Sequence, residues 1–417
     1  MLERCAPTDW LPELRDRLPQ GAQIARLTSD ICVLSLGQFP VNPACLLSSR
    51  ISRNLRGETQ WFDALESLGQ TMRRRNVTLI TTKKTTVHPF AESFAARHGL
   101  SLTELTFFGK PGTRRRLLDL ANRDSLIAFR ASDAFHQPLR PIERTQILAC
   151  LATELYVVCA TACSQTKAIV DNRLGEDRPR SFAFSAAVER TLHRGWESQG
   201  GVLVPPIFRK RLSFCPVIGG DLAPICDFPA DDGDWLFHWT RNQQRWPDQS
   251  QRQFVDDLLS AKATTESSPL FALHRILSQR KLIASQIAIR GQSKVVCLSA
   301  APLEKLRQGR VYRKHRLRWD YEPYGLLIRR KALQRIGAQP VWYGTGEDWE
   351  SATATNRPFF QMKSSRLNWS EEQEWRFIGD LDLDRITPRD IIVFVPSEAE
   401  ARFLSRVSHW SLAVIRP

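Results

Sequence analysis

The sequence predicts two domains of different construction, an α/β domain with a parallel sheet followed by an α+β domain. Three observations predict this. Strand-like and helix-like segments alternate between residues 44 and 184. A stretch rich in Pro, Gly and Asp follows at 204–234 without sustained periodicity, and beyond it most strands are short. A chain of 417 residues is also too long for one ordinary core, so two or three domains are expected.

The first half supplies the parallel sheet. An apolar run at 44–52 precedes a helix at 61–76, in which apolar residues recur at helical spacing. The β-branched run at 77–82 is a strand. The elements expected next are a helix at 87–100, strands at 101–107 and 125–129, a helix at 143–153, a strand at 154–160, a helix at 164–175 and a strand at 180–184. Repetition of strand and helix in this way predicts a parallel sheet with helices on both faces.

Two polar turns follow strands of this sheet. "SSR" at 48–50 comes after the first clear strand, and "CSQTK" at 163–167 opens a helix after the strongest one. Parallel sheets bind ligands beyond the carboxyl ends of their strands, where helix N-termini offer free N–H groups. Capping of the helix by Ser164 explains the second turn without any ligand. The candidate ligand-binding residues are Ser49, Arg50, Ser164, Thr166 and Lys167.

The order strand–"SSR"–helix, followed by "ERTQILACLATELYVVCATACSQT", resembles the SLOG superfamily. This Rossmann-like fold is shared by DprA and the LOG phosphoribohydrolases. The resemblance covers about residues 25–205 and leaves 1–24 as an N-terminal extension. "CSQTK" stands where the family has a glycine-rich phosphate-binding turn. The resemblance therefore implies a domain that senses a nucleotide or nucleic acid, or that serves as a scaffold.

The second half, from 234 to 417, follows a linker at 206–233. Its first strand, 234–241, places His238 and Thr240 on one face and Phe237 and Trp239 on the other. The elements expected next are a short helix at 254–261 in a polar insertion, an amphipathic helix leading into a strand at 270–285, a strand at 295–300, a strand–helix–strand unit at 324–344, and strands at 370–381 and 390–396.

The segment 370–381, which is predicted to be a strand, carries acids among apolar residues. Glu372, Glu374 and Arg376 share one face of it, opposite Trp375 and Phe377. Unpaired buried acids are costly, so this polar face must pair internally, face water or line a binding site. Two interpretations stay open at this point: a structural ion pair between Glu374 and Arg376, or a functional acid.

The combination of "HWT" at 238–240 with "EQE" at 372–374 resembles the ADP-ribosyltransferase-like superfamily. Its members bind NAD in a split sheet, with His-x-Thr on a first strand and Glu-x-Glu on a late one. The intervening "EPYGLLIRRKALQRIGAQPVWY" and the segment "FFQMKSSRLNWSEEQEWR" look like DarT-like and related uncharacterised bacterial families. The resemblance covers about residues 234–400.

The resemblance implies a role for each matching residue. Glu374 would hold a ribose hydroxyl and stabilise the charge that develops as the nicotinamide–ribose bond breaks, and Glu372 would orient or deprotonate an acceptor. His238 would bond the adenine-side ribose and Thr240 the nicotinamide side. The remaining candidates are Tyr324 or Tyr343 for stacking on nicotinamide, and Arg329, Arg330 and Lys363 for the pyrophosphate. Ordinary packing of the tyrosines, a solvated face for the arginines and a structural role for His238 are the alternatives.

The composition indicates which class of partner the protein binds. The net charge of +15 favours a polyanion, and the basic runs 73–75, 114–116, 208–212 and 310–318 are candidate contacts. A solvated basic surface is the alternative. No apolar run is long enough to span a bilayer and no signal peptide is recognisable, so we expect a cytoplasmic protein. The cysteines are scattered without a C-x-x-C pair, so we expect no metal site.

These observations lead to one functional prediction. The chain is expected to be an enzyme, an NAD-dependent ADP-ribosyltransferase or NAD glycohydrolase. It would transfer ADP-ribose to a protein, DNA or RNA acceptor, or to water, under control of its first domain in bacterial defence or a toxin system. The alternative is an inactive nucleic-acid-binding scaffold or a subunit of a larger complex.

Overall fold

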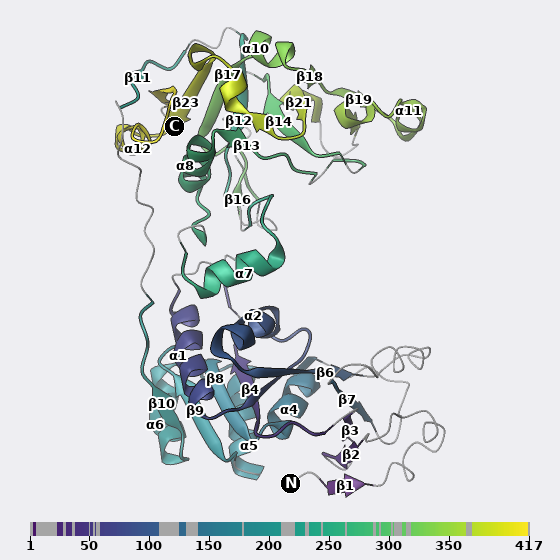
Figure 1. Ribbon diagram of the computed structural model, residues 1–417, viewed down its shortest axis with the longest axis vertical. Coiled ribbons are helices and arrows are strands. Elements are labelled where there is room, and N and C mark those ends of the chain that lie inside the picture. The colour runs from purple at the N-terminus through teal and green to yellow at the C-terminus, as the bar shows by residue number, and fades with distance from the viewer. Residues whose placement is uncertain are drawn as a thin grey trace. The chain divides into compact units, whose positions relative to one another are not determined.

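A computed structural model gives the fold. It describes residues 3–5, 23–27, 31–35, 38–49, 51–52, 55, 59–107, 125–130, 141–176, 179–209, 222–229, 233–242, 245–262, 265–286, 289–291, 293–301, 303, 311–313, 318–363 and 369–415. The chain forms two compact units (Figure 1). Unit 1 comprises Met1–Arg211 and Arg252–Lys262, and unit 2 comprises Leu212–Gln251 and Ala263–Pro417. The predicted fold class is confirmed, because a Rossmann-like α/β unit is followed by a second unit built on another sheet.

Unit 1 is built on a sheet with the strand order β1-β2-β3-β7-β6-β5-β4-β8-β9-β10. From β7 to β10 all neighbours are parallel, whereas β1, β2, β3 and β7 pair antiparallel. The strands are β1 (Glu3–Cys5), β2 (Gln23–Arg26), β3 (Ile31–Ser35), β4 (Pro43–Ser48), β5 (Thr78–Thr81), β6 (Ser101–Phe107), β7 (Ser125–Arg130), β8 (Glu154–Cys159), β9 (Ser181–Ser185) and β10 (Val202–Val204). The sequence did not predict the antiparallel edge, and β1 lies inside the predicted N-terminal extension.

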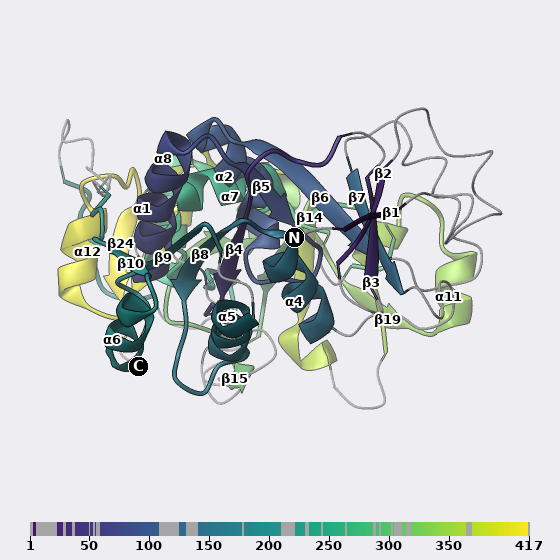
Figure 2. The ribbon, with the colours of Figure 1, turned by 90° about the horizontal axis from the view of Figure 1, so that it is seen from below.

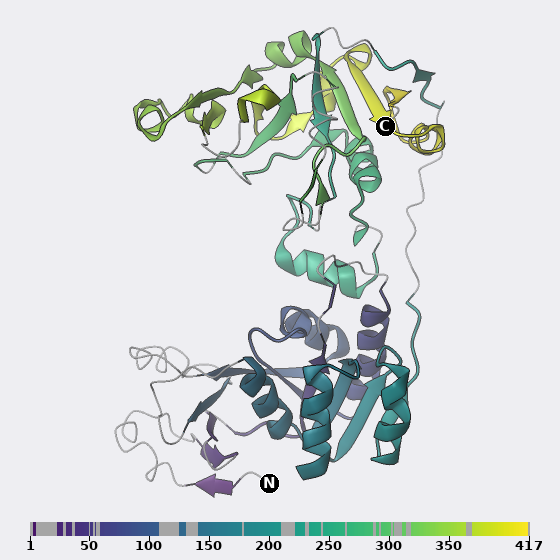
Figure 3. The same ribbon diagram turned by 180° about the vertical axis from the view of Figure 1, so that it is seen from behind.

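Helices cover both faces of this sheet. Alternation along β4 sends Cys45 and Leu47 to one face and Ala44 and Leu46 to the other. The first face packs on α4, α5 and α6, and the second on α1, α2 and α7. Figure 2 shows α1 and α2 above the strands and α4, α5 and α6 below them, and Figure 3 shows the teal helices in front of the sheet. The helices are α1 (Gln60–Arg74), α2 (His88–His98), α4 (Pro141–Leu151), α5 (Gln165–Glu176), α6 (Arg190–Ser198) and α7 (Gln251–Leu259).

Helix α7 lies within the second half of the sequence but packs on unit 1. Its apolar residues Phe254, Val255, Leu258 and Leu259 join the core that α1 and α2 form. The predicted helix at 254–261 therefore exists, but its partner is in the first half of the chain. The apolar side chains explain this, because they need a core that the polar insertion around them does not offer.

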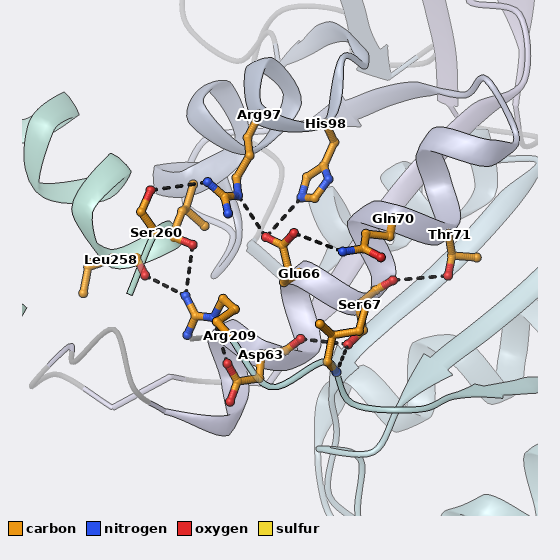
Figure 4. A network of polar contacts seen from close by, with 12 residues as sticks. Asp63, Glu66, Ser67, Gln70, Thr71, Arg97, His98, Arg209, Leu258 and Ser260 are labelled. Atoms are coloured by element: carbon orange, nitrogen blue, oxygen red, sulfur yellow. Dashed lines mark hydrogen bonds and ion pairs between the residues drawn. The ribbon is translucent and has the colours of Figure 1, made fainter. Parts of the chain in front are cut away.

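Arg209 fixes the end of α7 to α1 (Figure 4). Its Nε donates to Asp63 Oδ1 at 2.7 Å, and its Nη1 donates to the carbonyls of Leu258 and Leu259 at 2.8 and 3.0 Å. Arg97 of α2 adds a bond to Ser260 Oγ at 3.3 Å. The arginine thus adds a donor to two carbonyls in the last turn of α7, where a helix lacks intrahelical partners for its carbonyls.

We expect Arg209→Ala to lower the free energy of unfolding by about 3–5 kcal/mol, because it leaves Asp63 as a buried charge without its partner. The two side chains are only 6% and 13% exposed. Urea unfolding measures the loss. The matched control is Arg402→Ala, which breaks an ion pair with Glu398 whose side chains are 75% and 72% exposed, so its loss should stay below about 0.5 kcal/mol. Equal losses in the two variants would contradict the role given to Arg209.

The segment predicted as a linker, 206–233, contributes to both units where it is described. Near its start, Ile207 N–H donates to Ser67 Oγ of α1 at 2.8 Å. Further on, β11 (Ile225–Cys226) pairs in parallel with β24 (Ser411–Val414) of unit 2. Both described parts are therefore held by main-chain hydrogen bonds or strand pairing.

Unit 2 is built on a sheet with the order β11-β24-β23-β17-β12-β14-β21-β18. The remaining strands of that sheet are β12 (Trp235–Trp239), β14 (Val295–Ser299), β17 (Gly325–Arg329), β18 (Gln339–Pro340), β21 (Glu374–Ile378) and β23 (Ile391–Val395). Short pairs form outside it: β13 (Lys281–Leu282) with β22 (Leu381–Asp382), β15 (Tyr312–Arg313) with β16 (Arg318–Trp319), and β19 (Trp342–Gly344) with β20 (Phe360–Met362).

One face of this sheet carries the larger core. Leu236, Leu298, Trp375 and Phe377 pack there with apolar residues of α8, α10 and α12. The opposite face carries a smaller cluster around Phe237 and Trp239, whose rings stack with centroids 5.6 Å apart. The helices and turns of the unit are α8 (Pro269–Gln279), α10 (Arg330–Arg335), α11 (Gly346–Ser351), α12 (Glu398–Leu404), η4 (Arg357–Phe359), η5 (Trp369–Glu372), η6 (Leu383–Arg385) and η7 (Pro388–Asp390).

Some predicted features fall outside the described residues. The basic run 114–116 does so entirely, and the runs 208–212 and 310–318 do so in part. Only the run 73–75, at the C-terminus of α1, is described throughout. Among the described helices none is long and apolar enough to cross a bilayer. Within the same residues, no group of three or more His, Cys, Asp or Glu side chains could hold a metal ion.

Candidate active site

Three neighbouring strands bring the predicted functional residues of unit 2 together. β12 carries His238, β14 lies beside it, and β21 begins at Glu374. β14 pairs with β21 along its whole length, which sets Glu374 opposite Ser299 and Arg376 opposite Cys297. The histidine and the late acid are thus separated by a single strand.

The sheet is split between β12 and β14. Both strands have five residues, yet the register joins them only at Phe237 and Ser299. His238 follows that pair, and its Nδ1 lies 3.0 Å from the carbonyl oxygen of Cys297. A carbonyl only accepts, so Nδ1 carries the proton and Nε2 keeps a lone pair. The ring thus joins the two strands through a side-chain hydrogen bond and leaves Nε2 as an acceptor.

Desolvation is the main influence on the half-buried His238 ring and lowers its pKa to about 4. The bond to Cys297 acts in the opposite direction, and the charge of Arg241 lowers the pKa further. The ring is therefore neutral at physiological pH, which suits a hydrogen-bond acceptor for a hydroxyl group.

This pKa predicts an acid-sensitive contribution to stability. The folded-state pKa lies below the unfolded value, so unfolded chains bind the proton first, and stability is lost as the pH falls from about 6.5 towards 4. His238→Asn removes this titration. We expect wild type to lose more stability than the variant between pH 7 and pH 4.5, as measured by urea midpoints. Parallel losses would show that His238 titrates normally in the folded chain.

Glu374 pairs with the buried Arg376. The Arg376 Nε and Nη2 donate to the two Glu374 oxygens at 2.9 and 3.0 Å. Their side chains are 1% and 14% exposed. Arg376 also donates to the carbonyls of Pro358 and Phe360 at 2.9 and 2.7 Å, and to Gln361 Oε1 at 2.7 Å. The ion pair that the sequence left as one of two interpretations is therefore present, and it fixes the Glu374 carboxylate at the start of β21.

Glu372 does not share a strand with Glu374, so the prediction of one acidic face is wrong. Glu372 ends η5, and Gln373 has a left-handed backbone with φ of 45° that separates it from β21. The turn is held from β14, where Ser299 Oγ donates to Glu372 O at 2.6 Å and Ala300 N–H donates to Gln373 O at 3.1 Å. The apolar side of the prediction is confirmed, since Trp375 and Phe377 lie in the core.

The Glu372 carboxyl is held by a residue that the sequence did not single out. Tyr321 Oη donates to Glu372 Oε1 at 2.8 Å. Burial is the main cause that raises the pKa of Glu372, while Tyr321 and Arg241 lower it and Glu374 and Asp320 raise it. A carboxyl group with a raised pKa, next to a second carboxylate, is the arrangement that acid–base chemistry uses.

Tyr343 joins the same cluster. Its hydroxyl accepts from Glu374 N–H at 3.4 Å. Burial raises the pKa of Tyr343, and among its other influences the charges of Glu374 and Glu372 also raise it. Of the two predicted tyrosines, Tyr343 is therefore the one beside the acids.

Thr240 and Tyr324 take part in structural bonds instead. Thr240 is buried, and its hydroxyl donates to Pro269 O at 3.1 Å, which ties the end of β12 to α8. The Tyr324 hydroxyl donates to Glu400 Oε1 of α12 at 2.8 Å. Glu400 follows β23, on the other side of β12 from β21 in the sheet order.

Arg329 and Lys363 lie apart from the acids. Arg329 pairs with Trp235 at the far end of β12, where its guanidinium lies 4.1 Å from the Trp235 ring centroid and 3.4 Å from Asp234 Oδ2. Lys363 is exposed after β20, and its charge lowers the pKa of Asp348 only as the last of several influences. Neither is brought to the carboxylates in this structure.

Arg241 is a second cation near these groups, besides Arg376. Its charge acts on His238, Cys297, Tyr321 and Glu372. It directly follows "HWT", so reading the motif one residue further finds it. Cys297 is partly reached by solvent, yet desolvation and then the Glu374 charge raise the pKa of its thiol.

In unit 1 the two predicted turns lie at the same edge of the sheet. β4 and β8 are parallel neighbours, and Ser49 N–H donates to Cys159 O at 2.8 Å. The chain leaves β4 toward β5 on one side and β8 toward β9 on the other, so the strand order reverses between them. Ligands of doubly wound sheets bind at such a reversal. Arg50 lies outside the described residues.

The second turn makes the contacts of an ordinary helix cap. Ser164 Oγ accepts from Lys167 N–H at 3.2 Å and donates to Thr161 O at 2.7 Å. Thr166 is buried, and Lys167 pairs with Asp171 one turn along α5. The capping alternative is therefore present in the structure, and these contacts do not by themselves require a ligand.

No family model matches the chain, and no curated protein matches it. A solved structure of DNA processing protein A (DprA) from Streptococcus pneumoniae is similar to part of it, with 18% identity and a TM-score of 0.29. The likeness covers 42% of this chain and 62% of that protein.

Proposed function

We propose that unit 2 is an ADP-ribosyltransferase-like enzyme that cleaves NAD at the nicotinamide–ribose bond and passes ADP-ribose to a macromolecule or to water. The observation that carries this proposal is the position of Glu372 and Glu374, which flank Gln373 at the start of β21, with only β14 between that strand and His238 at the point where the sheet splits. Two half-buried carboxyl groups, with one strand between them and a neutral histidine, suit recognition of ribose hydroxyls and stabilisation of a developing positive charge.

Each residue contributes a distinct part. Glu374, fixed by Arg376, places a negative charge where the ribose becomes positive, which is worth most in a site that excludes water. His238 Nε2 accepts a hydrogen bond from a ribose hydroxyl. Arg241 offers a guanidinium for the pyrophosphate, in place of Arg329 and Lys363, which lie elsewhere. Tyr343 offers a ring beside Glu374 for the nicotinamide. NAD supplies an activated ADP-ribosyl group on a cationic leaving group.

For unit 1 we propose control of that activity. A nucleotide or a nucleic-acid end held where β4 and β8 end is the ligand class that the net charge of +15 favours. Such a ligand changes turnover only if it binds the active and inactive states unequally. A regulated NAD-consuming enzyme of this kind would serve in bacterial defence or as a toxin, and its partners would be the acceptor and the sensed ligand.

The test is to incubate the full chain with NAD labelled in its adenylate part. Separate reactions contain a protein, a DNA or an RNA acceptor. Label on an acceptor, or free ADP-ribose, supports the proposal. The comparison variant is His238→Ala, which should weaken NAD binding without lowering the melting temperature. A large loss of melting temperature with binding retained would make His238 structural.

Binding measurements with NAD and with nucleic acid distinguish the enzyme from the alternative, a nucleic-acid-binding scaffold. A nucleic-acid-binding scaffold would bind no NAD, but its affinity for DNA or RNA would fall steeply with salt because basic side chains displace counterions. Absence of NAD binding together with this salt dependence would replace the enzymatic proposal with the scaffold.

A further inference from the structure

Tyr321 is the least expected member of the candidate site. It precedes β17 in a turn, and its backbone is left-handed with φ of 56°. A bulky aromatic residue rarely adopts this conformation, which costs free energy that the surrounding structure must supply. Gln373, next to Glu372, is also left-handed with φ of 45°. The two strained positions are joined through the bond between Tyr321 and Glu372.

The surroundings hold Tyr321 in place. Its ring meets Trp239 edge-on, with centroids 5.7 Å apart and an interplanar angle of 77°. Trp239 in turn stacks on Phe237 of the same strand. On the other side, Ser299 Oγ fixes the main chain of Glu372 at 2.6 Å. Both ends of the Tyr321–Glu372 bond are therefore anchored in the sheet before any ligand is present.

We propose that Tyr321 is a positioning residue that orients the Glu372 carboxyl for proton transfer with the acceptor. This inference rests on the proposed function. The acceptor hydroxyl or amine gives its proton to Glu372 and forms a bond to the ribose carbon. Nicotinamide leaves with the electron pair of the nicotinamide–ribose bond. Glu372 then returns the proton to solvent.

The charges around Glu372 suit this role. Tyr321, Arg241, Glu374 and Asp320 are the groups that act on its titration. Burial and then Glu372 itself raise the pKa of Tyr321, so the hydroxyl stays protonated and donates throughout the neutral range. With Oε1 occupied by Tyr321, the proton that Glu372 takes up is directed to Oε2.

The test uses Tyr321→Phe, which keeps the ring against Trp239 and removes only the hydroxyl. Loss of a bond that favours the charged carboxylate raises the pKa of Glu372, so the rising acidic limb of the pH–rate profile should move to higher pH. We expect turnover to fall by about tenfold or more at pH 6 and to recover partly at alkaline pH. Tyr324→Phe is the matched control, because it removes a tyrosine–glutamate bond elsewhere in unit 2 and should leave the limb in place.

A second readout does not depend on turnover. Carbon NMR of the full chain labelled at glutamate carboxyls, with Glu372→Gln to assign the signal, follows Glu372 directly. Its midpoint should shift upward in Tyr321→Phe. If the midpoints of wild type and Tyr321→Phe coincide, the inference fails even where NAD is consumed. If the midpoint shifts while wild type cleaves no NAD, the proposed function fails and the positioning of Glu372 by Tyr321 stands.

Discussion

Glu374→Gln is expected to reduce nicotinamide release and label transfer by about 10²–10³-fold, the effect of removing one electrostatic group aimed at a developing charge. The amide keeps the shape of the side chain and loses its negative charge. Turnover is measured with saturating NAD on protein shown to be folded by circular dichroism, because the same change also leaves Arg376 without its partner.

The control separates catalysis from folding. Arg376→Gln breaks the same ion pair but keeps the Glu374 carboxylate. If Glu374 acts on the substrate, turnover per folded molecule falls far more in Glu374→Gln than in Arg376→Gln. Equal losses in the two variants would show that Glu374 serves only to hold the fold, as the structural interpretation of the pair has it.

Arg376→Gln itself should lower the free energy of unfolding by about 3–5 kcal/mol, since breaking a buried ion pair leaves an uncompensated charge. Arg376 is 1% exposed and also bonds the carbonyls of Pro358 and Phe360, which its loss leaves without that donor. Urea unfolding followed by tryptophan fluorescence measures the change.

Arg402→Gln is the matched control here, because the pair of Arg402 with Glu398 is exposed and contributes little to stability. If Arg376→Gln lowers the free energy of unfolding no more than Arg402→Gln does, the Arg376 guanidinium does not stabilise the segment from η4 to β20. That result would contradict the central structural role given to Arg376.

Local sequence patterns predicted where the strands and helices of unit 1 lie. They did not predict which of these elements pack together. The strands 78–81 and 101–107 follow from β-branched and apolar runs, and Gly99 ends α2 in the left-handed conformation that such a stop requires. Helix α7 follows from its periodicity, but its packing on α1 and α2 does not, because those contacts join segments far apart in the sequence. A fragment beginning at residue 234 would expose the apolar face of α7, so tests of unit 2 need the full chain.

The site shows the same limit. A period of two predicted the alternation of Trp375 and Phe377, yet it failed at Glu372 because Gln373 interrupts the strand with a positive φ. The Tyr321–Glu372 bond spans 51 residues, and no local pattern indicates it. Charge alone favours Arg329 and Lys363 as pyrophosphate ligands, and charge does not determine which end of a strand a residue occupies.

The most direct measurement is nicotinamide release from NAD by the full chain, supplied with DNA, RNA and nucleotide ligands in turn. The proposed function predicts that nicotinamide accumulates under at least one of these conditions, that Glu374→Gln and His238→Ala remove the activity, and that Arg402→Gln retains it. If folded wild-type protein releases no nicotinamide under any of them and binds no NAD, unit 2 is not an NAD-cleaving enzyme.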